Sequence, residues 1–246
     1  MFDAKSLLDQ FLGSASGQPG ARGDGLGSGQ GNGLGNILGQ LNGFGGGAAA
    51  GGLVGLLLGT KQGRRLAGNA LQYGGMAVVG ALAYRAFQNW QAGRTSAAPQ
   101  LHSALLPPPA DTPFAPAAAA DQQSLARHLL RAMVAAAKAD GHIDDKERAA
   151  IFSEMQKLPL STADRTFVMD ELNKPLDIDA VARGARTPEE AASLYMASLL
   201  AIDVDHAAER GYLAMLAARL HLDDALVAHL HATIETASQP QPPAAA

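Results

Sequence analysis

The sequence contains no cysteine in its 246 residues. This absence excludes a disulfide framework, an iron–sulfur cluster, a thiolate zinc site and a cysteine nucleophile. Glycine is scarce after residue 93, where only three of the 28 occur, whereas seventeen lie between Gly13 and Gly52. No three-residue glycine period is present, so a collagen-like fold is excluded as well. The glycine excess therefore marks one segment and does not define the whole protein.

Acidic residues are missing from residues 25–110, although five basic residues occur there. This middle region has a net charge of +5, and residues 111–246 have a net charge of -8. The basic middle suits an anionic surface such as a membrane. The acidic end would be repelled by phosphates, so we expect no nucleic-acid partner.

Five glycines recur at every fourth residue: Gly47, Gly51, Gly55, Gly59 and Gly63. On a helix they form one continuous groove, with leucines around the rest of the circumference. Such a helix is poor in water because each interior glycine costs about 1 kcal/mol relative to alanine. In lipid, small residues let helices pack closely, so the spacing predicts a membrane helix of the glycine-zipper type.

A second uncharged stretch covers residues 66–84 and is also close to the roughly 20 residues that span a bilayer. It ends near Tyr84, Arg85, Phe87 and Trp90, which is typical of an interfacial edge. We predict that at least one stretch inserts into a membrane. Peripheral binding and a soluble flexible arm are the alternatives. Basic residues flank the stretches almost evenly, so charge does not fix the orientation.

Composition divides the chain into six parts. We expect a short amphipathic helix at 1–12, a Gly-rich disordered tether at 13–46 and membrane-associated helical segments at 47–92. A Pro- and Ala-rich linker at 93–120 then leads to a helical domain at 121–237 and a disordered tail at 238–246.

From residue 121 onward, apolar residues recur at helical spacing and nothing resembles a strand. Residues 187–190 have the N-cap, first-turn proline and capping-box glutamate of a helix start. We therefore expect an all-α fold, with a bundle of about six to seven helices in this domain. The predicted core positions are Leu125, Leu129, Met133, Ala136, Ile151, Met155, Leu158, Phe167, Val168, Leu172, Tyr195, Leu199, Ile202, Tyr212, Met215, Leu216, Leu220, Leu226, Leu230 and Ile234.

Two acidic turns carry the candidate chemistry. Asp144 with Glu147, and Asp205 with Glu209, would each project from one helical face, where carboxylates bind Ca²⁺ or Mg²⁺. The same acids also suit helix capping without any metal, and that alternative stays open. No pair of histidines has the spacing of a zinc site, and the glycine-rich tract lacks the Lys-Ser/Thr of a phosphate-binding loop.

The segments 135–148 and 201–213, together with the apolar glycine-rich region before them, resemble the YebE-like family of bacterial inner-membrane proteins. The C-terminal part is similar to the tellurite-resistance TerB-like helical domain. The resemblance implies an inner-membrane location, no established enzyme activity, and a link to metal binding and stress-response assemblies. The second turn departs from the family's Asp-Gly pattern at Val204. The matching acids are Asp140, Asp144, Glu147, Asp203, Asp205 and Glu209.

We therefore expect a non-enzymatic, membrane-anchored protein whose acidic helical domain, on the cytoplasmic side, binds a divalent cation or a protein partner. Membrane lipid, a second copy of the chain or another membrane protein are the expected partners. One alternative is a hydrolase that uses paired carboxylates of the acidic turns. The other is a purely structural membrane protein that forms oligomers.

Overall fold

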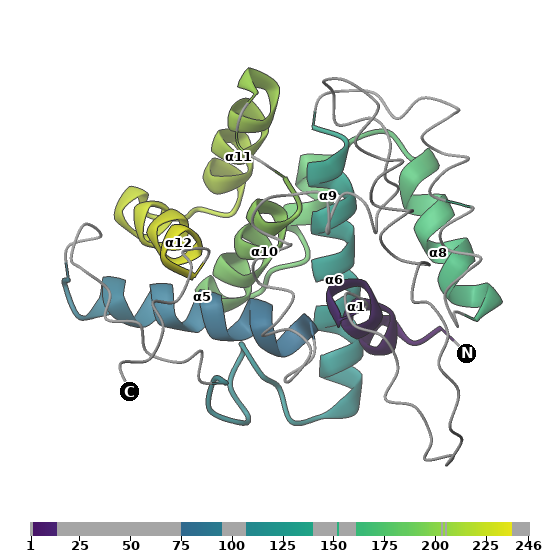
Figure 1. The fold of residues 1–246 in the computed structure, drawn as a ribbon, viewed down its shortest axis with the longest axis horizontal. Coiled ribbons are helices and arrows are strands. Elements are labelled where there is room, and N and C mark those ends of the chain that lie inside the picture. Colours follow the sequence, from purple (N-terminus) through teal and green to yellow (C-terminus); the bar gives the residue numbers. More distant parts are fainter. Residues whose placement is uncertain are drawn as a thin grey trace, which may run out of the picture.

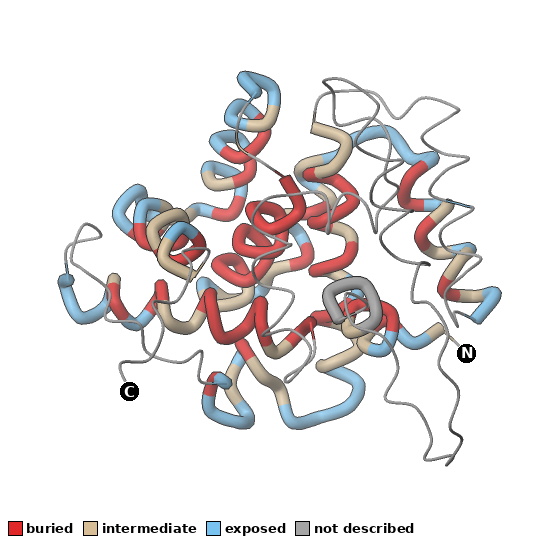
Figure 2. The backbone as a smooth tube through the Cα atoms, viewed as in Figure 1, coloured by how far each residue is buried: buried red, intermediate tan, exposed pale blue. Residues whose placement is uncertain are grey.

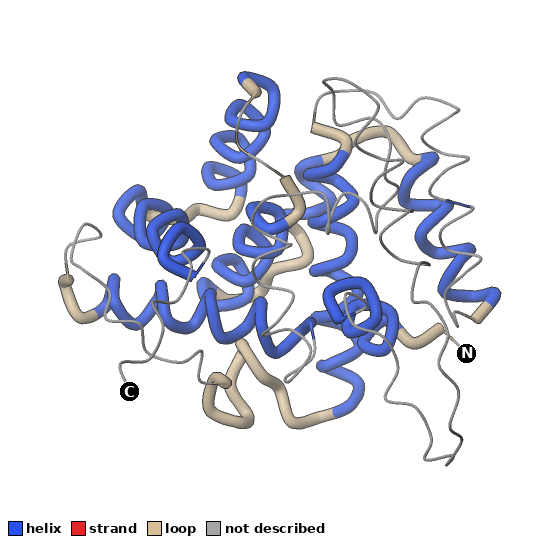
Figure 3. Tube along the Cα trace, viewed as in Figure 1, coloured by secondary structure: helices blue, strands red, loops and turns tan. Residues whose placement is uncertain are grey.

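The computed structural model describes residues 2–13, 75–94, 107–139, 152, 161–202, 204 and 206–237. Regular structure within these residues is helical, apart from one isolated bridge between Thr112 and Ala115 (Figures 1 and 3). The all-α prediction is thus confirmed for this part of the chain. The helices are α1 (Ala4–Gly13), α5 (Gly75–Gln91), α6 (Ala119–Ala137), α8 (Thr162–Asn173), α9 (Ile178–Ala182), α10 (Pro188–Leu200), α11 (Ala207–Arg219) and α12 (Asp224–Ala237).

Helix starts follow the local sequence closely. Thr187 is the N-cap of α10, and its hydroxyl accepts a hydrogen bond from the backbone N–H of Glu190 at 3.2 Å. Ser161 and Asp164 form a reciprocal capping box at the start of α8. Each pair satisfies backbone donors that a helix start leaves without partners. These two starts were predictable because the chemistry of a cap is local.

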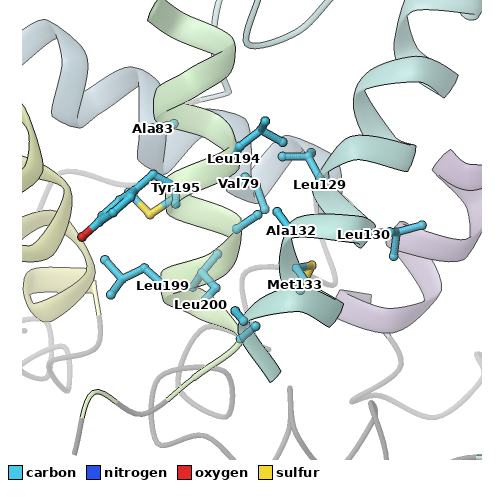
Figure 4. Packing of buried hydrophobic residues seen from close by; sticks show 14 of the residues in the cluster. Val79, Ala83, Leu129, Leu130, Ala132, Met133, Leu194, Tyr195, Leu199 and Leu200 are labelled. Carbon is cyan, nitrogen blue, oxygen red and sulfur yellow. The ribbon is translucent and has the colours of Figure 1, made fainter. Parts of the chain in front are cut away.

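Helix α10 lies at the centre of the unit, and every residue from Ala191 to Leu200 is buried (Figure 2). No charged residue occurs between positions 191 and 202, and a helix that is apolar all round belongs in a core. Its buried hydroxyls are satisfied internally, because Ser193 donates to the Glu189 carbonyl and Ser198 to the Ala132 carbonyl. Around α10 pack α5 and α6, whose apolar residues meet it in Figure 4.

Most predicted core positions are buried, but the prediction for Met215 is wrong, because this residue is 54% exposed. Helix α11 buries only Tyr212, Leu213 and Leu216 along its length. Met215 lies on the side of α11 away from the core. The prediction assumed a wider apolar face than the one that this helix buries. Ile151, Met155 and Leu158 lie outside the described residues.

Helix α5 occupies a different place from the one that its composition suggests. It packs against α12, α10 and α1 in the helical unit. Its glycine at position 80 faces protein: a Cβ there would lie 2.5 Å from the carbonyl oxygen of Phe114. Small residues permit close approach in water as well as in lipid, so the pattern alone does not distinguish the two. No helix among the described residues is both long and apolar enough to cross a bilayer.

The aromatic residues at the end of α5 are also engaged inside the protein. Tyr84 and Phe87 hold the ring of Phe114 edge-on, with centroids 5.4 and 5.6 Å apart, and Phe87 also meets Trp90. Phe114 belongs to the segment 93–120, where we expected a linker. Residues 107–118 of this segment instead fold as a loop that packs on α5, and α6 begins at Ala119.

The N-terminal helix α1 joins the same unit. Ala4, Leu7 and Leu8 are fully buried, and α1 packs against α6 and α5. Phe2 stacks at 4.6 Å on Phe167 of α8. The expected division at residue 121 therefore differs from the packing, because α1 and α5 contribute to the core of the helices that follow. The expected tether beyond Gly13, the glycine stripe from Gly47 to Gly63 and the tail at 238–246 lie outside the described residues.

Helix α8 is attached in part through an ion pair whose carboxylate is buried. Glu171, 7% exposed, accepts two hydrogen bonds from Arg131 of α6, at 3.2 and 3.0 Å, and one from Lys174 at 2.8 Å. Burial acts to raise the pKa of Glu171, but the hydrogen bonds from the two cations outweigh it and hold the pKa below its ordinary value. The pair thus adds a charged link between α8 and α6 to the apolar contacts of Val168 and Leu172.

Candidate functional site

A polar cleft of about 300 Å³ opens between three described segments: the loop at 107–116, helix α6 and the start of α10. Its size falls at the lower end of small-molecule pockets. Its polar groups include three carboxylates, a guanidinium, an imidazole and hydroxyls, while prolines and a leucine supply apolar surface. The lining residues are Asp111, Thr112, Pro113, Pro116, Asp121, Ser124, Leu125, His128, Arg186 and Glu190.

The loop that forms one wall of the cleft is supported by aromatic residues of α5. Buried Phe114 inserts between Tyr84 and Phe87, as described above. Asp111 has a φ of 61°, a left-handed conformation that aspartate tolerates better than most residues, and its N–H donates to the Ala115 carbonyl at 2.9 Å. The carbonyl oxygen of Thr112 accepts a hydrogen bond from the Ala115 N–H. The exposed carboxylate of Asp111 is thus carried on a fixed turn.

The α6 wall results from helical spacing. Asp121, Ser124, Leu125 and His128 occur at positions i, i+3, i+4 and i+7, which share one face of a helix. The acid lies in the first turn of α6, where a negative charge also stabilises the helix dipole. The hydroxyl and imidazole lie one and two turns further along.

The third wall is the start of α10. The Glu190 carboxylate accepts a hydrogen bond from the backbone N–H of Arg186 at 2.7 Å. The Arg186 guanidinium reaches across to α6 and donates to the Ser124 hydroxyl at 3.4 Å. Arg186 therefore contacts both Glu190 at the start of α10 and Ser124 of α6, and it links these two walls of the cleft.

His128 is kept largely neutral by its surroundings. Burial lowers its pKa below 6.5, and the positive charges of Arg131 and Arg186 act in the same direction. The carboxylate of Glu190 and a hydrogen bond to the Gly184 backbone oppose this only in part. Gly184 lies close to the imidazole: a Cβ at this position would be 3.0 Å from the His128 ring. At pH 7 the imidazole therefore adds a neutral polar group to the cleft.

The acidic turns identified from sequence lie almost wholly outside the described residues, which applies to Asp140, Asp144, Glu147, Asp203 and Asp205. Glu209 is described, and its carboxylate accepts from the backbone N–H of His206 at 3.1 Å as part of a capping box. In the described part of the chain, no group of three histidine or acidic side chains is arranged to hold a metal ion. The Ca²⁺ or Mg²⁺ site stays a prediction.

Sequence reasoning missed the cleft. The loop leads directly into α6, but Arg186 and Glu190 follow nearly 60 positions after His128, and no motif joins them. One signal was present: Asp121, Ser124 and His128 recur at helical spacing along one edge of the apolar stripe, which shares Leu125 with the cleft. The loop wall gave no such signal, because its proline content reads as a linker.

Comparison with known proteins places the chain in a family. Residues 43–234 match a family described as a protein of unknown function, DUF533. The match covers α5 to nearly the end of α12 and most of the chain, so the protein belongs to this family. The family description carries no activity.

One relative, described as an uncharacterized protein in the ampR 5' region of Yersinia enterocolitica, is 42% identical over 90 residues. The match covers 37% of this chain and 65% of the relative, so it spans slightly less than two thirds of that protein's length. No solved structure matches the chain. The fold and the cleft are therefore interpreted from this structure alone.

Proposed function

We propose that this protein is a non-enzymatic binding protein held at the bacterial inner membrane. The cleft carries the proposal, because three separately fixed segments place charged groups of both signs around one space. A concave site with a few fixed polar groups is typical of specific recognition of a small group. The function is thus binding of a ligand or a partner's side chain.

The membrane half of the proposal is supported by sequence. The glycine stripe ends at Gly63, and α5 begins at Gly75. The eleven residues between them reach at most about 40 Å when fully extended. If the stripe lies in lipid, the helical unit and its cleft remain near the membrane surface. The stripe would also allow association with lipid-embedded partners, including other copies of the chain.

A binding role is favoured over a hydrolytic one by the partners of the cleft residues. Ser124 and His128 lie on one face of α6, and a nucleophile must hydrogen-bond directly to its base. Ser124 instead hydrogen-bonds to Arg186, and the His128 ring packs against Gly184. A hydrolase built on the acidic turns would use residues other than these.

Fractionation of cells expressing the full chain tests the anchor. We expect the protein in the membrane fraction, resistant to high salt and released by detergent. Recovery of the full chain in the soluble fraction without detergent would contradict membrane anchoring. Gly55→Leu should reduce association between copies in detergent or lipid, because a leucine fills the proposed groove, and leave the unfolding of the helical unit unchanged.

The second predicted site is tested separately. If the acidic turns bind a divalent cation, millimolar Ca²⁺ or Mg²⁺ raises the melting temperature of the full chain, and Asp140→Asn with Asp144→Asn removes the rise. An unchanged melting temperature would leave these acids with a capping role alone.

A further inference from the structure

The charges around the cleft do not balance. Asp111, Asp121 and Glu190 contribute three negative charges, and Arg186 contributes the single positive one. His128 is neutral at pH 7 because burial lowers its pKa. The lining therefore has a net charge of about -2, and a bound group of positive charge would be attracted electrostatically.

The kind of cation is limited by the side chains present. Among the described residues no set of three donors suits a metal ion, which favours an organic cation. The lining contains no phenylalanine, tyrosine or tryptophan ring, so it lacks the faces that recognise quaternary ammonium groups. Carboxylates and a hydroxyl accept hydrogen bonds, which a primary ammonium group donates.

The shape of the lining supports the same class. Pro113, Pro116 and Leu125 provide apolar surface beside the acceptors. An alkyl chain can lie on such surface while its charged end remains with the carboxylates. The loop that carries Asp111 is fixed by the buried ring of Phe114, so little ordering is needed on binding.

We propose that the cleft binds a primary alkylammonium group, with the ammonium at Asp111 and Asp121 and the alkyl chain over the two prolines and Leu125. This inference rests on the binding function proposed above and names its ligand class. A free aliphatic amine and a lysine side chain of a partner protein present the same chemistry.

Calorimetric titration of the purified full chain with 1,5-diaminopentane tests the proposal. Saturable binding is expected, weakened by salt, and tetramethylammonium and butyrate should not compete. The first competitor has the charge without N–H donors, and the second has the opposite charge. Displacement of the diamine by tetramethylammonium at equal concentration would overturn the hydrogen-bonded ammonium site.

Charge-neutral variants locate the site. Asp111→Asn and Asp121→Asn should each weaken binding by about tenfold, the effect expected for a lost charge-assisted hydrogen bond. Asp170→Asn removes an exposed carboxylate of α8 outside the cleft and should change affinity less than about twofold. Equal losses in all three variants would show only a general charge effect and would overturn the assignment.

Arg186→Gln provides a test with the opposite sign. Removal of the one cationic side chain in the lining should strengthen diamine binding several-fold, whereas structural damage to the cleft would weaken it. Urea unfolding confirms that each variant is folded. Weaker binding by folded Arg186→Gln would contradict the proposed ligand class.

The source of the ammonium group is distinguished by a second probe. Binding of a lysine blocked at both backbone ends, with affinity comparable to the diamine, indicates a partner's side chain, and binding of the diamine alone indicates a free amine. Binding of neither probe overturns the inference. Membrane fractionation is independent of these titrations. If the protein is found in the membrane fraction but binds neither probe, the ammonium site is contradicted and the membrane anchor is not.

Discussion

Gly80 and Gly211 both lie inside helices, but their surroundings are opposite. A Cβ on Gly80 would lie 2.5 Å from the backbone oxygen of Phe114, whereas a Cβ on Gly211 would meet nothing within 4 Å. Gly80→Ala should therefore lower the free energy of unfolding by about 1–3 kcal/mol, because the loop must move. Gly211→Ala should raise it by about 0.5–1 kcal/mol through helix propensity.

Urea denaturation of the two single variants measures these shifts. A neutral or stabilising Gly80→Ala would mean that the loop at 107–116 does not press on α5, and the loop wall of the cleft would lose its support.

Two histidines link stability to pH. Burial lowers the pKa values of His128 and His231 below 6.5, and the Tyr195 hydroxyl lies 2.9 Å from Nε2 of His231. The unfolded chain binds protons more readily, so stability is complete above pH 6.5 and declines as pH falls toward the lowered pKa values. Urea midpoints at pH 7.5 and 5.5 should show this decline.

Replacement of each histidine by glutamine should make the midpoint less dependent on pH in that window. A wild-type midpoint that rises on acidification, or a pH dependence that both variants leave unchanged, would contradict the contribution of the two partly buried imidazoles.

At the scale of elements, the carboxylate of Glu171 helps to attach α8, beside the buried side chains of Val168 and Leu172. Glu171→Gln removes the charge that Arg131 and Lys174 share and should cost about 1–3 kcal/mol, because Arg131 loses its buried partner. The neighbouring Asp170→Asn is the matched control, since Asp170 is exposed and should change stability by less than about 0.5 kcal/mol. Thermal unfolding followed by circular dichroism distinguishes the two, and equal losses would contradict the proposed attachment.

Helix α1 is expected to stabilise the elements that it covers. Leu8 is fully buried, so Leu8→Ala should lower the free energy of unfolding by about 2–5 kcal/mol. Lys5→Ala on the exposed side removes a solvent-accessible pair with Asp9 and should cost less than about 1 kcal/mol. If Leu8→Ala costs no more than Lys5→Ala in denaturant unfolding, α1 is not part of the core.

Sequence patterns predicted elements better than their arrangement. The cap at Thr187 and the apolar stripe from Leu125 to Ala136 depend on neighbouring residues, and both were found as expected. The placement of α5 depends on contacts with α1, α10 and α12, which are distant in the sequence and which small residues permit without specifying. The cleft was hidden for a similar reason: the start of α10, which forms one of its walls, is nearly 60 residues from the α6 residues that it faces.

At the scale of the molecule, residues from Phe2 to Ala237 contribute to one core in the described structure, with α10 at its centre. A single core of this kind should open cooperatively, since α5, α6 and α10 bury one another. The cleft lies at the edge of this core, so its three walls should be lost together when the unit unfolds.

Amide hydrogen exchange on the full chain tests this unity most directly. Leu194 of α10 is fully buried, and Leu194→Ala should lower protection in α10, α6 and α5 by the same factor. Exposed Met215→Ala serves as the control and should leave all three unchanged. If protection falls in α6 and α10 while α5 keeps its wild-type value, α5 belongs to a separate body and the single helical unit is contradicted.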